Sequence, residues 1–114
     1  MPSRDKDVIG LTTEAQRQIE DIEAHGWFKD RVDIARFCLA FAVRSGCKPG
    51  LSDQVDTRWA AGNFDKAGEI RAVLRAMYPN VEHPVRLMEF LVNTGIEMVH
   101  RRVEEGAGPS ELLG

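Results

Sequence analysis

The longest apolar run in the chain is Phe37–Val43, within the segment RVDIARFCLAFAVRSG of residues 31–46. Three alanines in this segment favour a helix over a buried strand, which is the alternative for a short apolar run. Asp30 can cap the first turn, and Gly46 can end the helix in the left-handed conformation. A helix that is apolar on every face must be covered on all sides, by the rest of the chain or by another copy. The substitution Ala40→Asp is therefore expected to prevent folding or assembly.

Apolar residues also recur with helical spacing over residues 13–24, 70–77 and 84–104. The apolar positions are Ala15, Ile19 and Ile22 in the first segment, Ile70, Val73, Leu74 and Met77 in the second, and Val85, Met88, Val92, Ile96, Val99 and Val103 in the third. Asp65 can cap the second of these helices. Gly95, inside the last helix, costs roughly 1 kcal/mol relative to alanine, and close approach by another helix would explain it.

The remaining segments carry weaker patterns. Residues 7–11 alternate weakly and predict a short strand. Residues 47–65 lack clear periodicity, and a segment of this length without it is expected to be either functional or locally ordered. Val55 and Trp59, spaced i and i+4, predict a short helical turn, and Trp59 is expected to anchor this segment to the core. Residues 105–114 are expected to form a flexible tail.

Together these elements predict an all-α, mainly helical fold in a single domain over residues 1–114, with four main helices and a possible N-terminal strand. Three amphipathic helices offer few surfaces with which to cover one fully apolar helix. A homo-oligomer is therefore expected. Its interface is predicted at Phe37, Leu39 and Phe41 on the apolar helix, or at the surface around Gly95.

Composition narrows the possible partners. The 114 residues carry 15 basic and 18 acidic side chains, a net charge of −3, which counts against a strongly basic nucleic-acid-binding surface. A local basic patch can still act within an acidic protein. No apolar run approaches the roughly 20 residues that cross a bilayer, and the N-terminus lacks the apolar stretch of a signal peptide. A cytoplasmic location without membrane contact is expected.

No motif of catalysis or of cofactor binding stands in the sequence. His25, His83 and His100 lack the spacing of metal ligands. No glycine-rich phosphate loop precedes a helix. Cys38 lies in the apolar run and is expected to be an inert thiol, whereas Cys47 is the more reactive candidate without an evident base. The sequence therefore predicts a protein that is not an enzyme and holds no metal or cofactor.

The order of short strand, amphipathic helix and buried helix over residues 6–46 resembles a ribbon-helix-helix unit, here followed by two added helices over residues 65–104. That family implies a dimer whose paired strands read the DNA major groove. Val8 and Gly10 would then face DNA, and neither offers a polar side chain for base contacts. The region 29–31 can still contact phosphate through backbone amides and a helix N-terminus.

The second half resembles the DndE family, small accessory proteins of bacterial DNA phosphorothioate modification. The segments GEIRAVLRAMY of residues 68–78 and NTGIEMVHRRV of residues 93–103 carry the resemblance, which covers most of residues 8–103. The matching pieces are Gly68-Glu69, Gly95-Ile96-Glu97-Met98-Val99 and Arg102-Val103. The resemblance implies a ribbon-helix-helix variant with added helices, a homo-oligomer, binding of duplex or nicked DNA through surface lysines, and partner proteins of a modification complex.

The leading hypothesis is a non-enzymatic, DNA-associated accessory protein of a modification or defence system. Sequence-independent contact with the DNA backbone is assigned to Lys6, Lys29, Arg31 and Lys48, acting from an oligomer that multiplies a weak patch. One alternative is a ribbon-helix-helix transcriptional regulator or antitoxin with a preferred operator. The other is a helical protein-interaction scaffold without DNA binding, which the acidic balance and scattered arginines favour.

Overall fold

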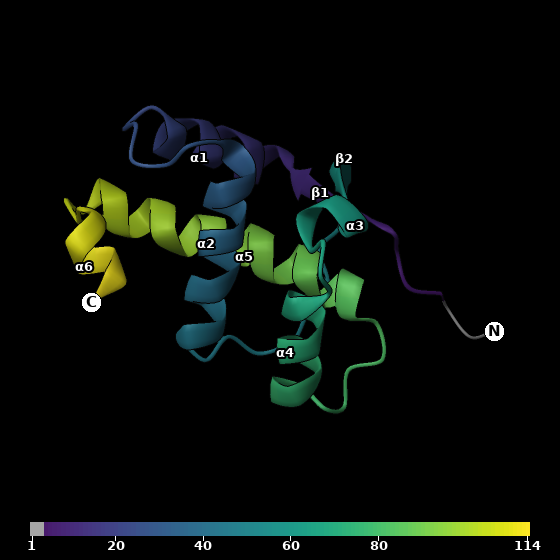
Figure 1. The fold of residues 1–114 in the computed structure, drawn as a ribbon. Helices are drawn as coiled ribbons and strands as arrows, with labels where there is room; N and C mark the ends of the chain where they lie inside the picture. Colours follow the sequence, from purple (N-terminus) through teal and green to yellow (C-terminus); the bar gives the residue numbers. More distant parts are fainter. Residues whose placement is uncertain (1–3) are drawn as a thin grey trace.

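The fold is described for residues 4–114 by a computed structural model, so the first three residues of the predicted domain lie outside the described part (Figure 1). The elements in chain order are β1 (Val8–Thr12), α1 (Thr13–Glu23), α2 (Arg31–Arg44), β2 (Val55–Ala60), α3 (Ala61–Phe64), α4 (Glu69–Met77), α5 (Pro84–Glu104) and α6 (Pro109–Leu113). The predicted mainly helical class is confirmed, with a two-stranded antiparallel sheet in addition. Over residues 4–114, the helices are all too short or too polar to cross a membrane.

The centre of the fold is the crossing of α2 over α5, the longest helix (Figure 1). A Cβ atom built on Gly95 of α5 would lie 2.0 Å from the carbonyl oxygen of Cys38 in α2. The close helix approach suggested by this mid-helix glycine is therefore present, and α2 is the neighbour. Because Gly95 is buried inside one chain, a second copy cannot pack on it, and the interface predicted at Gly95 is wrong.

The chain covers α2 on all but one face. Asp30 caps the helix as predicted and accepts a hydrogen bond of 3.0 Å from the amide of Asp33. Ala35 and Cys38 are fully buried, but Ala40 is exposed. The rest of the chain therefore leaves part of the apolar run uncovered, and its cover by another copy stays a prediction. A charge at residue 40 would therefore stand at the surface of the folded chain.

The sheet pairs β1 with β2, a strand that replaces the short helical turn predicted at Val55 and Trp59. The register of the two strands shifts between Ile9 and Gly10. A Cβ atom on Gly10 would lie 2.7 Å from a methyl carbon of Val55, so glycine is required there. Trp59 is half-buried, and its ring centroid lies 5.8 Å from that of Phe64, which confirms its predicted anchoring role.

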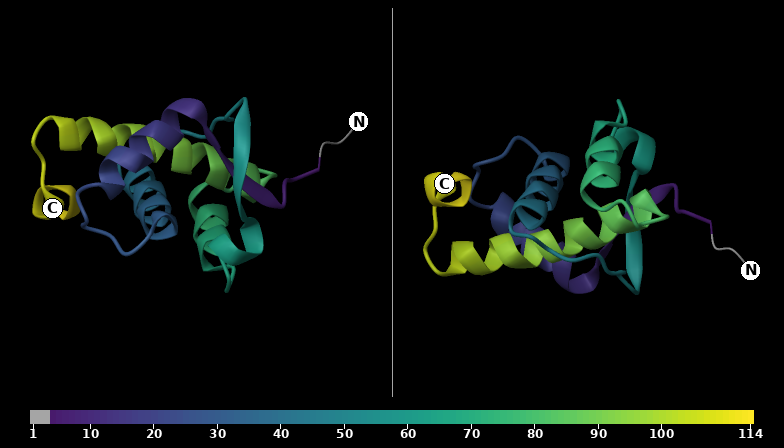
Figure 2. Two further views of the ribbon diagram at one scale, coloured as in Figure 1. Left: turned by 90° about the horizontal axis from the view of Figure 1, so that it is seen from above. Right: turned by 90° about the horizontal axis from the view of Figure 1, so that it is seen from below.

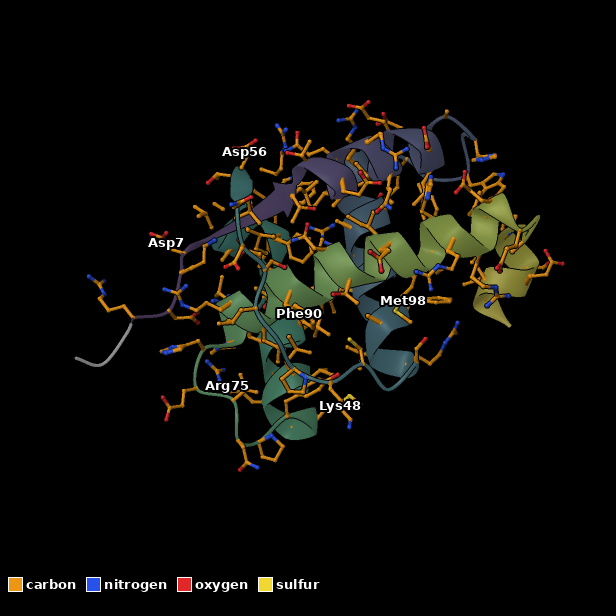
Figure 3. The ribbon with its side chains drawn as sticks, turned by 180° about the vertical axis from the view of Figure 1, so that it is seen from behind. Asp7, Lys48, Asp56, Arg75, Phe90 and Met98 are labelled. Atoms are coloured by element: carbon orange, nitrogen blue, oxygen red, sulfur yellow. The ribbon has the colours of Figure 1, made fainter. Side chains whose placement is uncertain are left out.

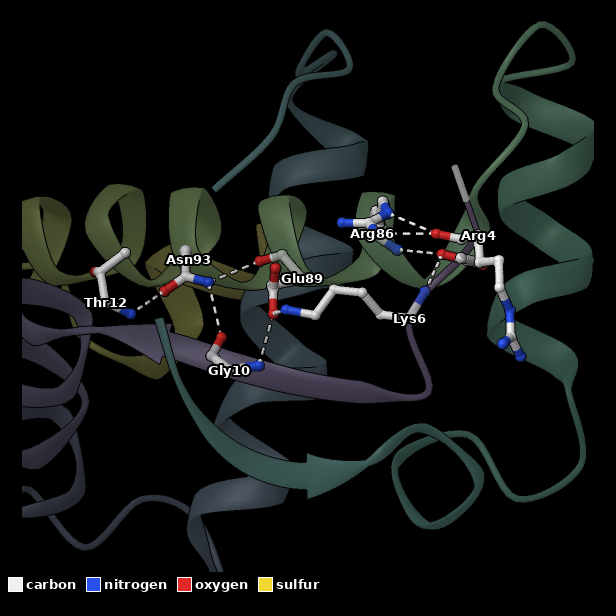
Figure 4. Close-up of polar contacts among 8 residues, drawn as sticks. Arg4, Lys6, Gly10, Thr12, Arg86, Glu89 and Asn93 are labelled. Carbon is white, nitrogen blue, oxygen red and sulfur yellow. Dashed lines mark hydrogen bonds and ion pairs between the residues drawn. The ribbon is translucent and has the colours of Figure 1, made fainter. Parts of the chain in front are cut away.

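Two polar side chains of α5 occupy the other edge of β1 (Figure 4). Glu89 accepts the amide of Gly10 at 2.9 Å and pairs with the ammonium of Lys6. Asn93 accepts the amide of Thr12 at 2.9 Å and donates to the Gly10 carbonyl at 3.0 Å. β2 and α5 thus satisfy both edges of this strand within the chain. The ribbon-helix-helix unit, which pairs this strand with a second copy, is not confirmed.

Gly68 occupies the N-cap position of α4, which begins at Glu69, and Asp65, the predicted cap, binds the first turn of the helix from three residues before Gly68. Its carboxylate accepts the amides of Ile70 at 2.9 Å and Arg71 at 3.1 Å, and the Arg71 guanidinium at 2.9 Å. Burial alone would raise the pKa of Asp65, but these hydrogen bonds and the arginine charge outweigh burial and lower the pKa. Of the apolar face predicted for α4, only Leu74 is buried.

The predicted flexible tail contains a short helix, α6, that folds back on the protein. Both views of Figure 2 show it beside the loop between α1 and α2. Leu112 is 1% exposed in this position, and Arg44 of α2 donates to its carbonyl oxygen at 2.6 Å. The expectation of a flexible segment is therefore wrong for residues 109–113.

Candidate functional site

An open apolar groove of about 400 Å³ lies between α2 and α4. It is lined by Arg36, Leu39, Ala40, Val43, Arg44, Glu69, Ile70, Val73 and Leu74. Val73 is 52% exposed, and Met77, 54% exposed, continues the apolar face of α4 one turn further. Large apolar side chains that remain exposed together mark a surface suited to contact with another molecule.

The two ends of this groove carry different charges. α2 and α4 run in the same direction (Figure 1), so their first residues lie toward one end. Glu69 is the first residue of α4, and Arg44 is the last residue of α2. Glu69 thus borders one end beside Arg36, whose guanidinium lies 3.4 Å from the Asp33 carboxylate. Arg44 borders the other end, with apolar side chains between the two ends.

Two of the four predicted DNA-contacting residues are held by carboxylates. Lys6 pairs with Glu89, whose side chain is 4% exposed. Arg31 donates to Glu23 at 2.9 Å and lies 4.0 Å from Glu20. The hydrogen bond that Arg31 donates to Glu23 is the main cause of the raised pKa of Arg31. A phosphate would therefore have to compete with these carboxylates for either cation.

Lys29 is placed differently, in a polar surface hollow of about 430 Å³ beneath the N-terminus of α2. The hollow is lined by Lys29, Asp30, Val32, Asp33, Arg36, Trp59, Asn63 and Lys66. Arg36 donates to the carbonyl oxygens of Phe64 at 2.9 Å and Asn63 at 3.2 Å, which fixes it beside the hollow. Lys66, which the sequence analysis did not select, is exposed and joins Lys29 there.

Lys48 lies apart from the other predicted DNA-contacting residues. It is exposed in the segment that follows α2. Figure 3 shows it far from Asp7, the neighbour of Lys6 in the chain, and from Asp56 of β2. The structure therefore does not bring Lys6, Lys29, Arg31 and Lys48 into one patch.

The residues predicted for an oligomer interface on α2 also lie in different surroundings. Leu39 lines the groove between α2 and α4. Phe37 is half-buried, with its ring centroid 5.3 Å from that of Phe28, and Phe41 is 8% exposed. The Arg44 guanidinium lies 5.5 Å from the centre of the Phe41 ring. Contacts within the chain therefore occupy most of the aromatic face.

The two cysteine thiols and His100 are each partly or fully buried. Burial raises the pKa of the Cys38 thiol strongly and that of Cys47 more weakly. His100, which is 5% exposed, lies 2.9 Å from a carboxylate oxygen of Asp21 and 3.5 Å from Glu104. Within residues 4–114, no three histidine, cysteine or acidic side chains gather as a metal site.

Comparisons with protein-family models, with curated proteins and with solved structures found no match. The functional argument therefore rests on the groove between α2 and α4 and on the polar hollow at Lys29. Sequence reasoning missed the groove because the spacing of Val73 and Met77 is the same in a core helix and in an exposed one.

Proposed function

We propose that this protein is a non-enzymatic assembly protein that forms a homo-oligomer through the groove between α2 and α4. The observation that carries the proposal is the apolar lining of this groove, in which Val73 is 52% exposed; Met77, 54% exposed, extends the apolar face of α4 beyond the lining. Fully burying a Val or Met side chain contributes about 1.5–3 kcal/mol. Several such side chains buried together offset much of the entropy lost on association.

The charges at the ends of the groove favour a second copy as the occupant. A two-fold axis across the groove reverses its direction in the partner. Glu69 of one copy would then oppose Arg44 of the other, and the pair would occur twice. Opposite charges at the rim of an interface fix its register and speed association.

The direct test is the oligomeric state of the full chain, measured by sedimentation equilibrium over a range of concentrations. Val73→Glu should weaken association at least tenfold because it places a charge against the apolar lining. Leu51→Glu is the matched control, since Leu51 is 72% exposed and lies outside the groove. Glu69→Lys should also weaken association by opposing the partner's Arg44. A wild-type chain that remains monomeric at every concentration would overturn the proposal.

The second candidate function is sequence-independent contact with DNA, as the resemblance to the DndE family suggests. The observation that favours it is that Lys29 and Lys66 line one polar hollow. Arg36 and two carboxylates, Asp30 and Asp33, also line this hollow. Neither lysine forms an ion pair with any group in residues 4–114. Two cations on an otherwise acidic protein imply weak contact from one copy, which an oligomer would multiply.

This candidate is tested by titrating a labelled random duplex, intact and nicked, at several salt concentrations. Each phosphate contact contributes about −0.9 to the slope of log affinity against log salt. The double variant Lys29→Ala/Lys66→Ala should therefore weaken binding. It should also make the slope less negative by the contribution of about two phosphate contacts. Lys48→Ala is the control, because Lys48 is exposed elsewhere. Affinity that does not respond to salt would exclude backbone contact.

A further inference from the structure

A second apolar site lies under α6, away from α4. Trp27, Phe28 and Phe37 form one side of it, and Leu112 and Leu113 of α6 form the other. About 130 Å³ remains between them. The site is therefore an aromatic pocket, built by α2 and the loop before it, into which a short helix inserts a leucine.

Two kinds of contact hold α6 in this aromatic pocket. Leu112 is 1% exposed, whereas Leu113 is 64% exposed, so a single leucine provides the apolar anchor. Arg44 donates to the carbonyl oxygen of Leu112 at 2.6 Å and to that of Leu113 at 3.1 Å. The last carbonyls of any helix lack partners within the helix. The pocket and Arg44 together therefore recognise a helix C-terminus that carries a leucine.

Docking adds to the hydrogen bonds of α6 itself, among them the one that the Gly108 amide donates to the Glu111 carboxylate at 2.6 Å. This helix has five residues, while isolated helices shorter than roughly 12–15 residues are marginal in water. The link to α5 contains Gly106, whose φ is 99°, followed by Ala107 and Gly108. Glycine permits the chain many directions after α5. The same short segment can therefore reach the pocket of its own chain or that of a neighbour.

We infer that the aromatic pocket is an exchangeable docking site and that its partner is residues 109–113 of a second copy of this chain. The exchange keeps every contact of Leu112 and Arg44, so it replaces an intramolecular contact with an identical intermolecular one. It uses a surface other than the apolar lining of the α2–α4 groove, although Arg44 borders both. The inference therefore does not depend on the proposed function.

The test uses the full chain and a labelled peptide of residues 106–114, with fluorescence anisotropy as the readout. The wild-type chain should capture the peptide weakly, because its own α6 fills the pocket. Leu112→Glu in the chain should release α6 and strengthen capture at least tenfold. A peptide carrying Leu112→Ala should not be captured by either chain. Val73→Glu should capture the peptide as the wild type does, which separates this site from the groove.

Further controls decide between the outcomes. Leu51→Glu, a charge at an exposed leucine outside the pocket, should capture as weakly as the wild type. Adding Arg44→Gln to the Leu112→Glu chain should reduce its capture of the peptide. If Leu112→Glu does not unfold cooperatively, Leu112→Ala replaces it with the same expectation. Two results would overturn the inference. One is equal capture of the peptide by the wild-type and Leu112→Glu chains. The other is no capture of the peptide by a Leu112→Glu chain that is folded.

Discussion

Gly95 is the single residue on which the packing of α2 against α5 most depends. A Cβ atom there would lie 2.0 Å from the carbonyl oxygen and 2.5 Å from the carbonyl carbon of Cys38, and backbone atoms cannot yield as a side chain can. Gly95→Ala gains roughly 1 kcal/mol of helix propensity but forces the helices apart, and overpacking costs about 1–3 kcal/mol. A net loss of unfolding free energy is expected in urea.

The control for Gly95→Ala is Gly62→Ala in α3, where an added Cβ meets nothing within 4 Å. That variant should be as stable as the wild type or more stable. A Gly95→Ala protein that gains stability would mean that α2 and α5 separate without cost.

Individual residues also show which features the sequence could predict. Local ones were predictable: Asp30 caps α2, and Asp65 binds the first turn of α4 from four residues before its start. The ion pairs of the predicted DNA contacts were not predictable, because Lys6 pairs with Glu89, which lies 83 positions away in the chain. Periodicity reports which face of an element is apolar, whereas the partner of a charge depends on the tertiary arrangement.

At the scale of elements, α4 should be the helix most sensitive to acid. The pKa of Asp65 is lowered in the folded protein, so its stabilising effect is present above the ordinary value of 3.8 and is lost as pH falls through the folded-state pKa. Asp65→Asn should cost about 1.5–3 kcal/mol at neutral pH. The difference from the wild type should shrink in acid, measured as urea unfolding at a series of pH values. Asp53→Asn, at an exposed position, should show no such trend.

The second prediction for elements concerns the attachment of β1 to α5. Lys6 and Glu89 form a largely buried pair, with side chains 21% and 4% exposed. Lys6→Met should leave the Glu89 carboxylate with only the Gly10 amide, and Glu89→Gln should leave the ammonium unpaired. In a double-mutant cycle the two changes should couple by about 0.5–3 kcal/mol. Additive effects would show that Lys6 does not help to hold the strand.

The same attachment explains why the predicted ribbon-helix-helix unit is not confirmed. A short strand followed by two helices matches that unit, and nothing within residues 6–46 shows where the strand finds its partner. The residues that indicate the partner of this strand lie in α5, where Glu89 and Asn93 interrupt an apolar stripe at a spacing of i and i+4. Buried polar groups require hydrogen-bond partners, and an unpaired strand edge supplies them.

At the scale of the whole molecule, the expectation of a homo-oligomer now has a specific surface and a sharper test. Ala40 was expected to be covered by the chain or by another copy; in the single chain it is exposed and lines the groove between α2 and α4. Ala40→Asp should therefore change the unfolding free energy of the single chain by no more than about 0.5 kcal/mol, the range of ordinary surface substitutions. The same change should weaken association strongly, because it leaves an unpaired carboxylate in an apolar interface.

Two measurements on one sample separate folding from assembly in the Ala40→Asp protein. Circular dichroism with urea unfolding at low concentration reports on the single chain, and sedimentation equilibrium reports on association. Ala72→Asp is the control, since Ala72 is exposed on α4 outside the groove. Loss of cooperative unfolding in Ala40→Asp would mean that residue 40 is buried within the chain. Unchanged association would mean that this groove is not the interface, and the apolar face of α4 would then need another occupant.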